Sequence, residues 1–217
     1  MKKMAKILSL PVQPPTKLGF ARVKKATRNR KKKLENHGQL NLFAAQTSAP
    51  AHIVPLPHKP ARPFEQALLL DEHDDPAAAS AYRKAISAGD SVPDAYCNLG
   101  ILEFKAGKTD RAFHCFTESL KADPRHMESH YNLGNLYFEH GEHRLAKLHY
   151  EIAAQIAPNF PNVYFNLGLV LAMQEDFESA AKALQKYTEL APKPEARRAR
   201  ELLAELQESL KAPRRRN

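Results

Sequence analysis

The sequence predicts an all-α fold, a solenoid of antiparallel helix pairs, from two observations. A short pattern that ends in Asn-Leu-Gly recurs at a step of 34 residues, at Tyr96–Gly100, His130–Gly134 and Tyr164–Gly168. In each unit an alanine follows the glycine by 12 residues, a bulky apolar residue follows it by 16 and a proline by 24. A repeat of this length holds two helices, and neighbouring units must stack to bury their apolar faces.

The order of these residues resembles the tetratricopeptide repeat. The positions that carry the resemblance are the three Leu-Gly pairs, Ala112, Ala146 and Ala180, Phe116, Tyr150 and Leu184, and Pro124, Pro158 and Pro192. The resemblance implies a right-handed superhelical solenoid over residues 61–194, with repeats at 93–126, 127–160 and 161–194. A degenerate repeat at 59–92 has Glu65-Gln66 where Leu-Gly is expected.

Apolar periodicity within a unit predicts which faces of the two helices meet. In the second of the three regular units, we expect one stripe of Leu133, Leu136 and Tyr137 to face another of Leu145, Leu148 and Ile152. Glycine lowers helix propensity by about 1 kcal/mol against alanine. We therefore expect Gly100, Gly134 and Gly168 to permit close approach of the partner helix at its small alanine.

A single closing helix is expected over residues 195–211. Its leucines repeat at helical spacing, so one face is apolar and suited to cap the last helix pair. These leucines are Leu202, Leu203, Leu206 and Leu210. Residues 212–217 follow as a basic tail that includes three consecutive arginines.

The net charge of +9 is divided unevenly along the chain. Residues 1–60 contain 13 Lys and Arg against one acid, residues 61–194 contain 13 against 19, and residues 195–217 contain seven against four. The nets are therefore +12, −6 and +3. Residues 1–60 are also rich in proline and poor in apolar periodicity, so we expect a disordered basic arm before an acidic repeat domain.

No stretch of the sequence approaches the 18 apolar residues of a membrane span. The apolar part that follows the first lysines runs only to Val12, which is short for a signal peptide. Two cysteines without a Cys-x-x-Cys motif favour buried thiols in a reducing compartment. We expect a cytoplasmic protein, or a nuclear one if the source is eukaryotic.

The resemblance places the partner-binding surface on the concave groove, which is lined by the first helix of each repeat. Asn98, Asn132 and Asn166 recur there and resemble the asparagine ladder by which some tetratricopeptide domains hold extended peptides. An amide can pair with a peptide backbone because it both donates and accepts. Neighbouring residues would supply pockets: Phe104, Tyr131, Asn135, Phe138, Phe165 and Leu169. The alternative is that the asparagines only stabilise each helix pair.

The charges expected near the groove argue against one kind of ligand. The family's clamp for acidic chaperone tails needs several Lys and Arg, whereas this groove offers three acids, Asp94, Glu128 and Glu139, against Lys105. An acidic C-terminal tail is therefore a poor candidate. The expected partner is another protein or a peptide segment of it.

The arm carries two further signals. Its basic run could contact nucleic acid or another polyanion through Lys24, Lys25, Arg28, Arg30, Lys31, Lys32 and Lys33. Next, Gln39-Leu40-Asn41-Leu42-Phe43 resembles the peptide by which bacterial proteins dock on the sliding clamp, through Gln39, Leu40, Leu42 and Phe43. An adaptor that holds nucleic acid or the clamp is thus the alternative function, beside a plain charged arm and an accidental match.

No catalytic constellation, cofactor motif or metal-ligand spacing is evident, so we expect neither an enzyme nor a cofactor. Five histidines lie close together in sequence: His126, His130, His140, His143 and His149. His126 and His130 could share a helical face and bind a divalent metal. Solvated helix ends are the favoured interpretation. The sequence does not determine the oligomeric state.

Overall fold

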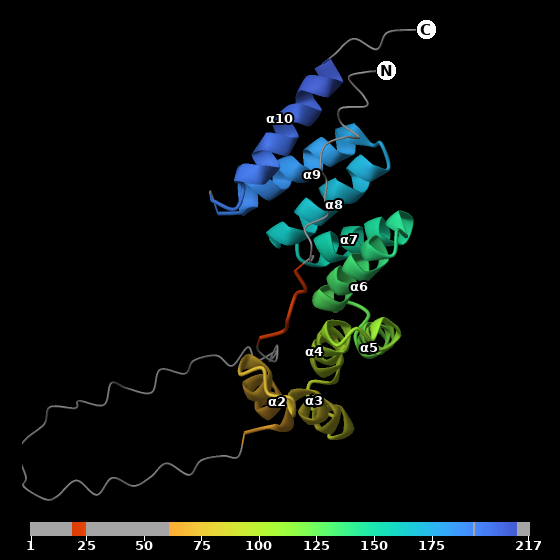
Figure 1. Ribbon diagram of the computed structural model, residues 1–217, viewed down its shortest axis with the longest axis vertical. Coiled ribbons are helices and arrows are strands. Elements are labelled where there is room, and N and C mark those ends of the chain that lie inside the picture. Colours follow the sequence, from red (N-terminus) through yellow and green to blue (C-terminus); the bar gives the residue numbers. More distant parts are fainter. Residues whose placement is uncertain (1–18, 25–60, 193, 212–217) are drawn as a thin grey trace, which may run out of the picture.

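The computed structural model describes residues 19–24, 61–192 and 194–211, and its regular structure over these ranges is helical (Figure 1). The helices form four antiparallel pairs and a final single helix: α2 (Pro63–Glu72) with α3 (Ala78–Ser87), α4 (Val92–Lys105) with α5 (Thr109–Ala122), α6 (Met127–Glu139) with α7 (His143–Ile156), α8 (Pro161–Met173) with α9 (Phe177–Leu190), and α10 (Arg197–Lys211). The predicted all-α helical repeat fold is confirmed.

The pairs stack in chain order, and α10 lies against α9 at the end of the stack (Figure 1). Buried residues at the start of α10 and in its middle, Ala199 and Leu206, join the cluster that holds Leu184 and Tyr187 of α9. The final helix therefore covers apolar surface that the last repeat leaves without a neighbour, as its leucine spacing predicts.

The helical glycines make room for a bulky side chain of the partner helix. A Cβ placed on Gly134 would lie 2.5 Å from Tyr150 Cε1, and one on Gly100 would lie 2.7 Å from Phe116 Cε1. The expected contact with the small alanine is therefore wrong at Gly100 and Gly134, whereas a Cβ on Gly168 would meet Leu184 at 2.8 Å and the main-chain oxygen of Ala180 at 3.5 Å. The glycine is needed because a Cβ at this position would overlap the bulky side chain 16 residues later.

The buried face of α7 also differs from the expected one. Ala146, Tyr150 and Ala153 are buried, whereas Leu145 and Leu148 are 39% and 49% exposed. The predicted stripe of Leu145, Leu148 and Ile152 is therefore wrong. Helices packed this closely need small residues beside the large ring, so the alanines face the core and the leucines face outward.

The bends within the pairs use left-handed backbone. Gly107 and Gly141 have φ of 74° and 75°, which glycine adopts without steric cost. Glu175 holds the equivalent place in the third regular unit with φ of 61°. The third regular unit thus keeps the left-handed conformation at its bend although it has glutamate there in place of glycine.

The first pair is shorter, in keeping with its degenerate sequence. Helices α2 and α3 have 10 residues each, against 13 or 14 in the next six. The Glu65-Gln66 pair is exposed, and α2 buries Phe64 and Ala67 instead. The ring centroids of Phe64 and Tyr82 lie 6.0 Å apart, and both residues belong to a core cluster that the first pair shares with the next one.

Candidate functional site

Residues 19–24 lie along the first helices of the repeats, far in sequence from the residues they contact (Figure 1). The segment starts beside α6 and passes α4 to reach α2, so it runs opposite to the order of the repeats. These residues depart from the disordered arm that we expected over 1–60. The remainder of the arm is outside the described residues.

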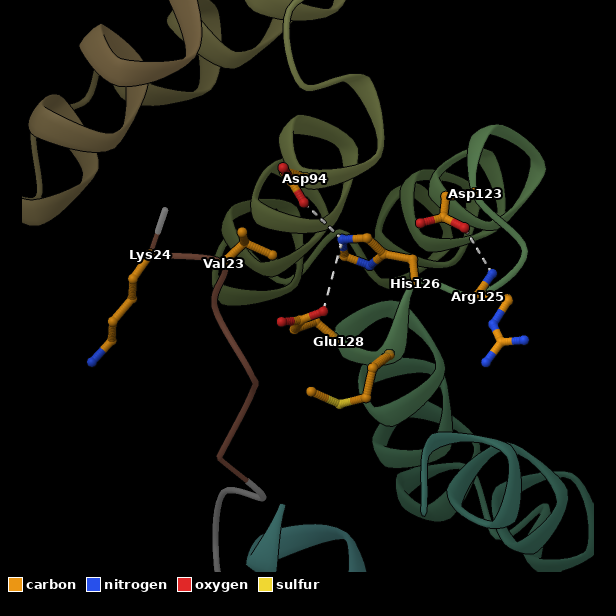
Figure 2. Close-up of a pocket in the computed structure, with 8 residues that line it drawn as sticks. Val23, Lys24, Asp94, Asp123, Arg125, His126 and Glu128 are labelled. Atoms are coloured by element: carbon orange, nitrogen blue, oxygen red, sulfur yellow. Dashed lines mark hydrogen bonds and ion pairs between the residues drawn. The ribbon is translucent and has the colours of Figure 1, made fainter. Parts of the chain in front are cut away.

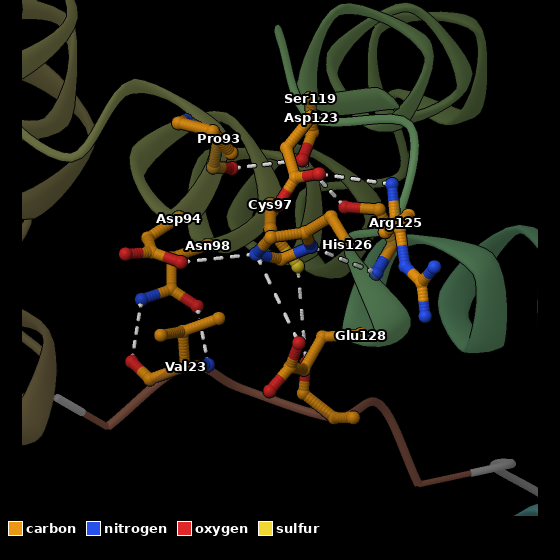
Figure 3. A network of polar contacts seen from close by, with 12 residues as sticks. Val23, Pro93, Asp94, Cys97, Asn98, Ser119, Asp123, Arg125, His126 and Glu128 are labelled. Carbon is orange, nitrogen blue, oxygen red and sulfur yellow. Dashed lines mark hydrogen bonds and ion pairs between the residues drawn. The ribbon is translucent and has the colours of Figure 1, made fainter. Parts of the chain in front are cut away.

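Two asparagines of the predicted ladder hold the backbone of this segment, and Figure 3 shows the first of them, Asn98, paired with Val23. Asn98 Oδ1 accepts a hydrogen bond from Val23 N at 3.0 Å, and Asn98 Nδ2 donates to Val23 O at 2.9 Å. Asn132 does the same with Ala21, at 2.8 Å and 3.0 Å. Each amide thus pairs with both polar groups of one residue, as a neighbouring strand would. Ala21 and Val23 are two residues apart, and the asparagines that hold them are one repeat apart. The spacing between successive repeats therefore matches two residues of extended backbone.

The third asparagine of the ladder, Asn166, contacts the segment indirectly, through Asn135. Asn166 Nδ2 donates to Asn135 Oδ1 at 2.9 Å and to the hydroxyl of Tyr131 at 3.1 Å. Asn135 Oδ1 also accepts from the Tyr150 hydroxyl at 2.8 Å. With its oxygen held twice, Asn135 directs its Nδ2 to Gly19 O at 3.3 Å. Asn166 therefore positions the residue that makes the contact.

A buried polar chain supports the other end of the segment. Asn98 Nδ2 also donates to the Tyr82 hydroxyl at 3.1 Å, and that hydroxyl donates to Asp71 Oδ2 at 2.9 Å. Arg22 Nη2 lies 3.0 Å from Asp71 Oδ1, whose side chain is 1% exposed. The guanidinium is not aligned for a hydrogen bond to this oxygen, so the contact is an ion pair. Burial, followed by the charge of Asp71, raises the pKa of Tyr82 well above its usual value, so the hydroxyl remains a donor.

The side chains of the segment enter the apolar core. The ring of Phe20 lies 4.5 Å from that of Phe104 and 6.2 Å from that of Phe116. Val23 is 5% exposed within the same cluster. Ala21 packs against the next cluster, around Tyr131 and Phe138. The segment therefore joins two parts of the solenoid core.

The remaining predicted groove residues are structural neighbours of this surface. Tyr131 packs its ring edge against Phe160, and Phe138 packs against His143. Phe165 lies beside Tyr187, and Leu169 is 4% exposed in the cluster that Ala21 contacts. The structure brings Asn98, Asn132, Asn135 and Phe104 into direct contact with the segment.

A pocket lies beside Val23 and Lys24, at the end of the described segment (Figure 2). Its centre is His126, which caps α6 by accepting from Ser129 N and lies 3.0 Å from Asp94 Oδ1 and 3.8 Å from Glu128 Oε2. Lys24 also lines this pocket, with its side chain extended away from His126. Since His126 is 6% exposed, its interpretation as a solvated helix end is wrong.

His130 is likewise buried, with Nδ1 at 3.0 Å from His149 Nδ1. Burial is the main cause that lowers the pKa of both rings, and the pKa of His149 falls to about 4. Two neutral rings can share one hydrogen bond, whereas two charged rings would repel each other. Among the described residues, no group of His, Cys, Asp or Glu is arranged to hold a metal.

Both cysteines, Cys97 and Cys115, are buried free thiols, as expected. Burial raises the pKa of Cys97 to about 12 and that of Cys115 to about 11, so both remain protonated at neutral pH. A protonated, enclosed thiol is a poor nucleophile. The surface along residues 19–24 thus consists of amide side chains paired with backbone and of apolar side chains.

Of the predicted basic contacts, Lys24 alone is in the part of the chain that the structure describes, and it is exposed. The others, Lys25, Arg28 and Arg30 to Lys33, are outside it, as are Gln39, Leu40, Leu42 and Phe43. None of the helices in the described ranges has the length and apolar character that crossing a membrane requires.

Comparison with known families agrees with the repeat geometry. Two family models, both described as tetratricopeptide repeat, match residues 97–161 and 161–194. The chain is a tetratricopeptide repeat protein. The matched residues cover helices α5 to α9 and most of α4, so the repeats that carry Asn98 and Asn132 are included.

Curated relatives of this tetratricopeptide repeat protein are distant and much longer. The BBSome complex member BBS4 of Bos taurus is 23% identical over 58% of this chain and 24% of its own length. Tetratricopeptide repeat protein 8 of Mus musculus is 28% identical over 56% of this chain and 21% of its own length. The chain thus spans about a quarter of the relatives it matches.

Solved structures show the same fold. A crystal structure of MamA superimposes with a TM-score of 0.57 and 22% identity, over 66% of this chain and 84% of that one. The first tetratricopeptide domain of Spaghetti (RPAP3), bound to the HSP90 peptide SRMEEVD, gives 0.51 and 24%, over 55% and 93%. At identities of 22% and 24%, these similarities show that the chain shares the fold of the two solved structures.

Sequence reasoning missed four side chains that this site uses, among them Arg22, which pairs with Asp71. Asp71 and Tyr82 belong to the degenerate repeat, where the 34-residue pattern is weakest. Phe20 lies in the arm, where no periodicity marks it. One signal was available: Tyr82 falls one repeat before Phe116, at the position of the large ring that packs onto the first helix.

Proposed function

We propose that this tetratricopeptide repeat protein is a protein-interaction scaffold that holds an extended segment of a partner in its concave groove. The observation that carries the proposal is the double hydrogen bond that each of Asn98 and Asn132 makes to one residue of an extended backbone. Tetratricopeptide repeat proteins generally mediate protein–protein interactions, which supports the same class of function.

The amides recognise the main chain, so they tolerate any side chain that fits. An isolated hydrogen bond contributes about 0.5–1.5 kcal/mol net, and four such bonds fix the register of the peptide more than its identity. Selectivity then comes from the pockets beside the amides, such as the site of Phe20 beside Phe104. This division of roles suits a scaffold whose partner is an unfolded segment.

The charge of the groove favours a basic segment. Asp71 is almost fully buried and carries the ion pair with Arg22, and Asp94 and Glu128 lie where the segment leaves. The HSP90 peptide in the RPAP3 structure contains three acidic residues. A ligand of that charge would meet repulsion at Asp71, so we propose a different partner class here.

Selection from a random peptide library displayed on phage tests the proposal, with the full chain as the target. Peptides that it enriches should bind at least tenfold more weakly to the double variant Asn98→Ala, Asn132→Ala. Asn162→Ala is the matched control, because Asn162 is an exposed amide at the start of α8 and should leave binding unchanged. Circular dichroism checks that each variant keeps its helicity.

If the enriched peptides bound the double variant as tightly as the parent, the binding surface would lie elsewhere and the groove proposal would fail. The proposal would fail equally if Asn162→Ala weakened binding as much as the double variant does. A uniform loss of helicity in the double variant calls for Asn98→Asp and Asn132→Asp, which keep the acceptor atom and remove the donor.

The nucleic-acid adaptor stays a prediction, because its residues other than Lys24 lie outside the described chain. Its test is binding of duplex DNA by the full chain and by a chain with Lys31, Lys32 and Lys33 changed to Ala, over a range of salt. Absence of binding at low salt would end this alternative. The clamp-docking motif requires Leu42→Ala with Phe43→Ala to abolish association with a sliding clamp.

A further inference from the structure

We infer that residues 19–24 are a built-in ligand of the groove, and that the partner is a segment with the same side-chain pattern: an aromatic residue, then arginine two positions on, then an aliphatic residue. Such a partner must displace residues 19–24 to bind. The inference rests on the proposed function, because it names the ligand and the regulation of the same groove.

The first argument is that the segment uses the recognition groups of the groove themselves. Both amide atoms of Asn98 and both of Asn132 are engaged by Val23 and Ala21, and both asparagines are fully buried. A second extended peptide cannot pair with the same four atoms. Occupation by residues 19–24 therefore excludes a partner held in this way.

The second argument is that Phe20, Val23 and Arg22 each contact repeat residues of matching chemistry. The first two make apolar contacts. The Phe20 ring contacts Phe104 and Phe116, which are aromatic and belong to one helix pair. Val23 is buried in the same cluster. Such contacts depend on side-chain identity, whereas the backbone bonds do not, so they define the pattern that a partner has to present.

Among these three side chains, Arg22 makes the most selective contact. Its guanidinium pairs with Asp71 Oδ1, and a further donor, Nη1, lies 3.5 Å from the Asp71 main-chain oxygen. Asp71 is held in place by Tyr82, which in turn contacts Asn98. A partner without a cation here would leave a buried carboxylate unpaired, which is costly. The buried chain thus links recognition of the arginine to recognition of the backbone.

The third argument concerns competition. The segment belongs to the same chain, so it competes at an effective concentration set by its tether instead of by its amount in solution. A partner segment with equal contacts has to overcome this advantage. The apparent affinity of the groove is lowered by the fraction of molecules in which it is open.

A dye-labelled peptide with the sequence of residues 17–26 is the probe, and fluorescence anisotropy measures its binding to full-length proteins. The release variant carries Phe20→Ala and Arg22→Glu, which remove the aromatic contact and reverse the charge at Asp71 while they leave the groove intact. Lys24→Ala is the matched control in the segment, because Lys24 is exposed and its side chain extends away from His126.

We expect the probe to bind the release variant at least tenfold more tightly than the parent chain, and the Lys24→Ala control as weakly as the parent. A probe that itself carries both substitutions should bind the release variant at least tenfold more weakly than the unmodified probe. Equal binding of the unmodified probe to parent and release variant, or no binding to either, would overturn the inference. Melting curves establish that the release variant is folded.

A further variant separates this inference from the proposed function. In the release background, Asn98→Ala with Asn132→Ala should abolish binding of the probe. If the release variant binds the probe and the two alanines change nothing, the built-in ligand stands and the backbone recognition proposed for the groove fails. If parent and release variant bind library peptides equally and both depend on the asparagines, the groove function stands and self-occupation fails.

In a second possible arrangement, residues 19–24 of one copy of the chain would occupy the groove of another copy. Sedimentation of the parent chain over a range of concentrations should show a single mass, the same as that of the release variant. A parent dimer that becomes a monomer in the release variant would overturn the intramolecular assignment, because residues 19–24 would then occupy the groove of another copy.

Discussion

Arg22 Nη2 lies 3.0 Å from Asp71 Oδ1, and the two residues come from opposite ends of a sequence interval that includes the whole stretch 25–60. The side chain of Asp71 is 1% exposed and that of Arg22 is 24% exposed. A charge buried to this degree needs its partner, so the pair fixes the register of residues 19–24 against the first repeat.

A double-mutant cycle measures this pair. Arg22→Ala, Asp71→Asn and the combination should show a coupling energy of about 0.5–3 kcal/mol, because the pair is partly shielded from water. Exchange of the Ala21 and Val23 amides with solvent reports the change. Glu72→Gln removes an exposed acid next to Asp71 and should alter nothing. Additive effects of the two substitutions would show that the ion pair is not formed.

Amide exchange within residues 19–24 should alternate. The N–H groups of Ala21 and Val23 donate to Asn132 and Asn98, whereas no acceptor among the described residues pairs with the N–H of Arg22. We expect slow exchange at 21 and 23 and faster exchange at 22 by nuclear magnetic resonance. Asn132→Ala should accelerate exchange at Ala21 more than at Val23. Equal rates along the segment would contradict an extended backbone held by the two amides.

The contact of His130 with His149 predicts acid sensitivity. The pKa of both rings is lowered in the folded state, and that of His149 to about 4, against 6.5 when unfolded. Between these values the unfolded chain binds more protons, so this contribution to stability is complete above pH 6.5 and is lost as pH falls toward 4.

Thermal melting measured from pH 7.5 to pH 4 checks this effect. We expect His149→Gln to remove about 1–3 kcal/mol of the pH-dependent loss. The control is His114→Gln, whose side chain is 70% exposed and should leave the profile as it is. A parent profile that stays flat from pH 6.5 to pH 4, or an unchanged profile for His149→Gln, would refute the assignment.

Glu175→Gly should stabilise the protein by about 1 kcal/mol. Glu175 has φ of 61° at the bend where the two preceding repeats have Gly107 and Gly141, and glycine adopts this backbone without steric cost. Urea denaturation measures the free energy of unfolding. Gln174→Gly is the matched control, with φ of −86°, and should be neutral or destabilising. A loss of stability in Glu175→Gly would show that the left-handed bend is not strained.

Gly134→Ala should destabilise the protein by about 1–3 kcal/mol, because the new methyl group would lie 2.5 Å from Tyr150 Cε1. That ring is fully buried and its hydroxyl is bonded to Asn135, so it cannot move aside easily. Denaturation in urea again gives the measurement. Gly19→Ala should be neutral, since no atom lies within 4 Å of a Cβ placed there. Equal stability of Gly134→Ala and the parent would contradict the close approach.

The 34-residue step determined the helical repeat fold and the paired helices from the sequence alone. It also placed Asn98 and Asn132 on one face of the stack, where the structure finds them. This was possible because a repeat states the same packing requirement several times. Three copies of Asn-Leu-Gly at the same spacing therefore support one prediction of the helix pairing.

The tertiary structure alone decided what lies in the groove and which face of α7 is buried. Periodicity could not choose between the leucines and the alanines of α7, because that choice depends on how much space the Tyr150 ring leaves. Nor could it connect Phe20 or Arg22 to the repeats, since each contact is made once, between residues far apart in the chain. Local pattern encodes what recurs, whereas a unique long-range contact exists only once the chain has folded.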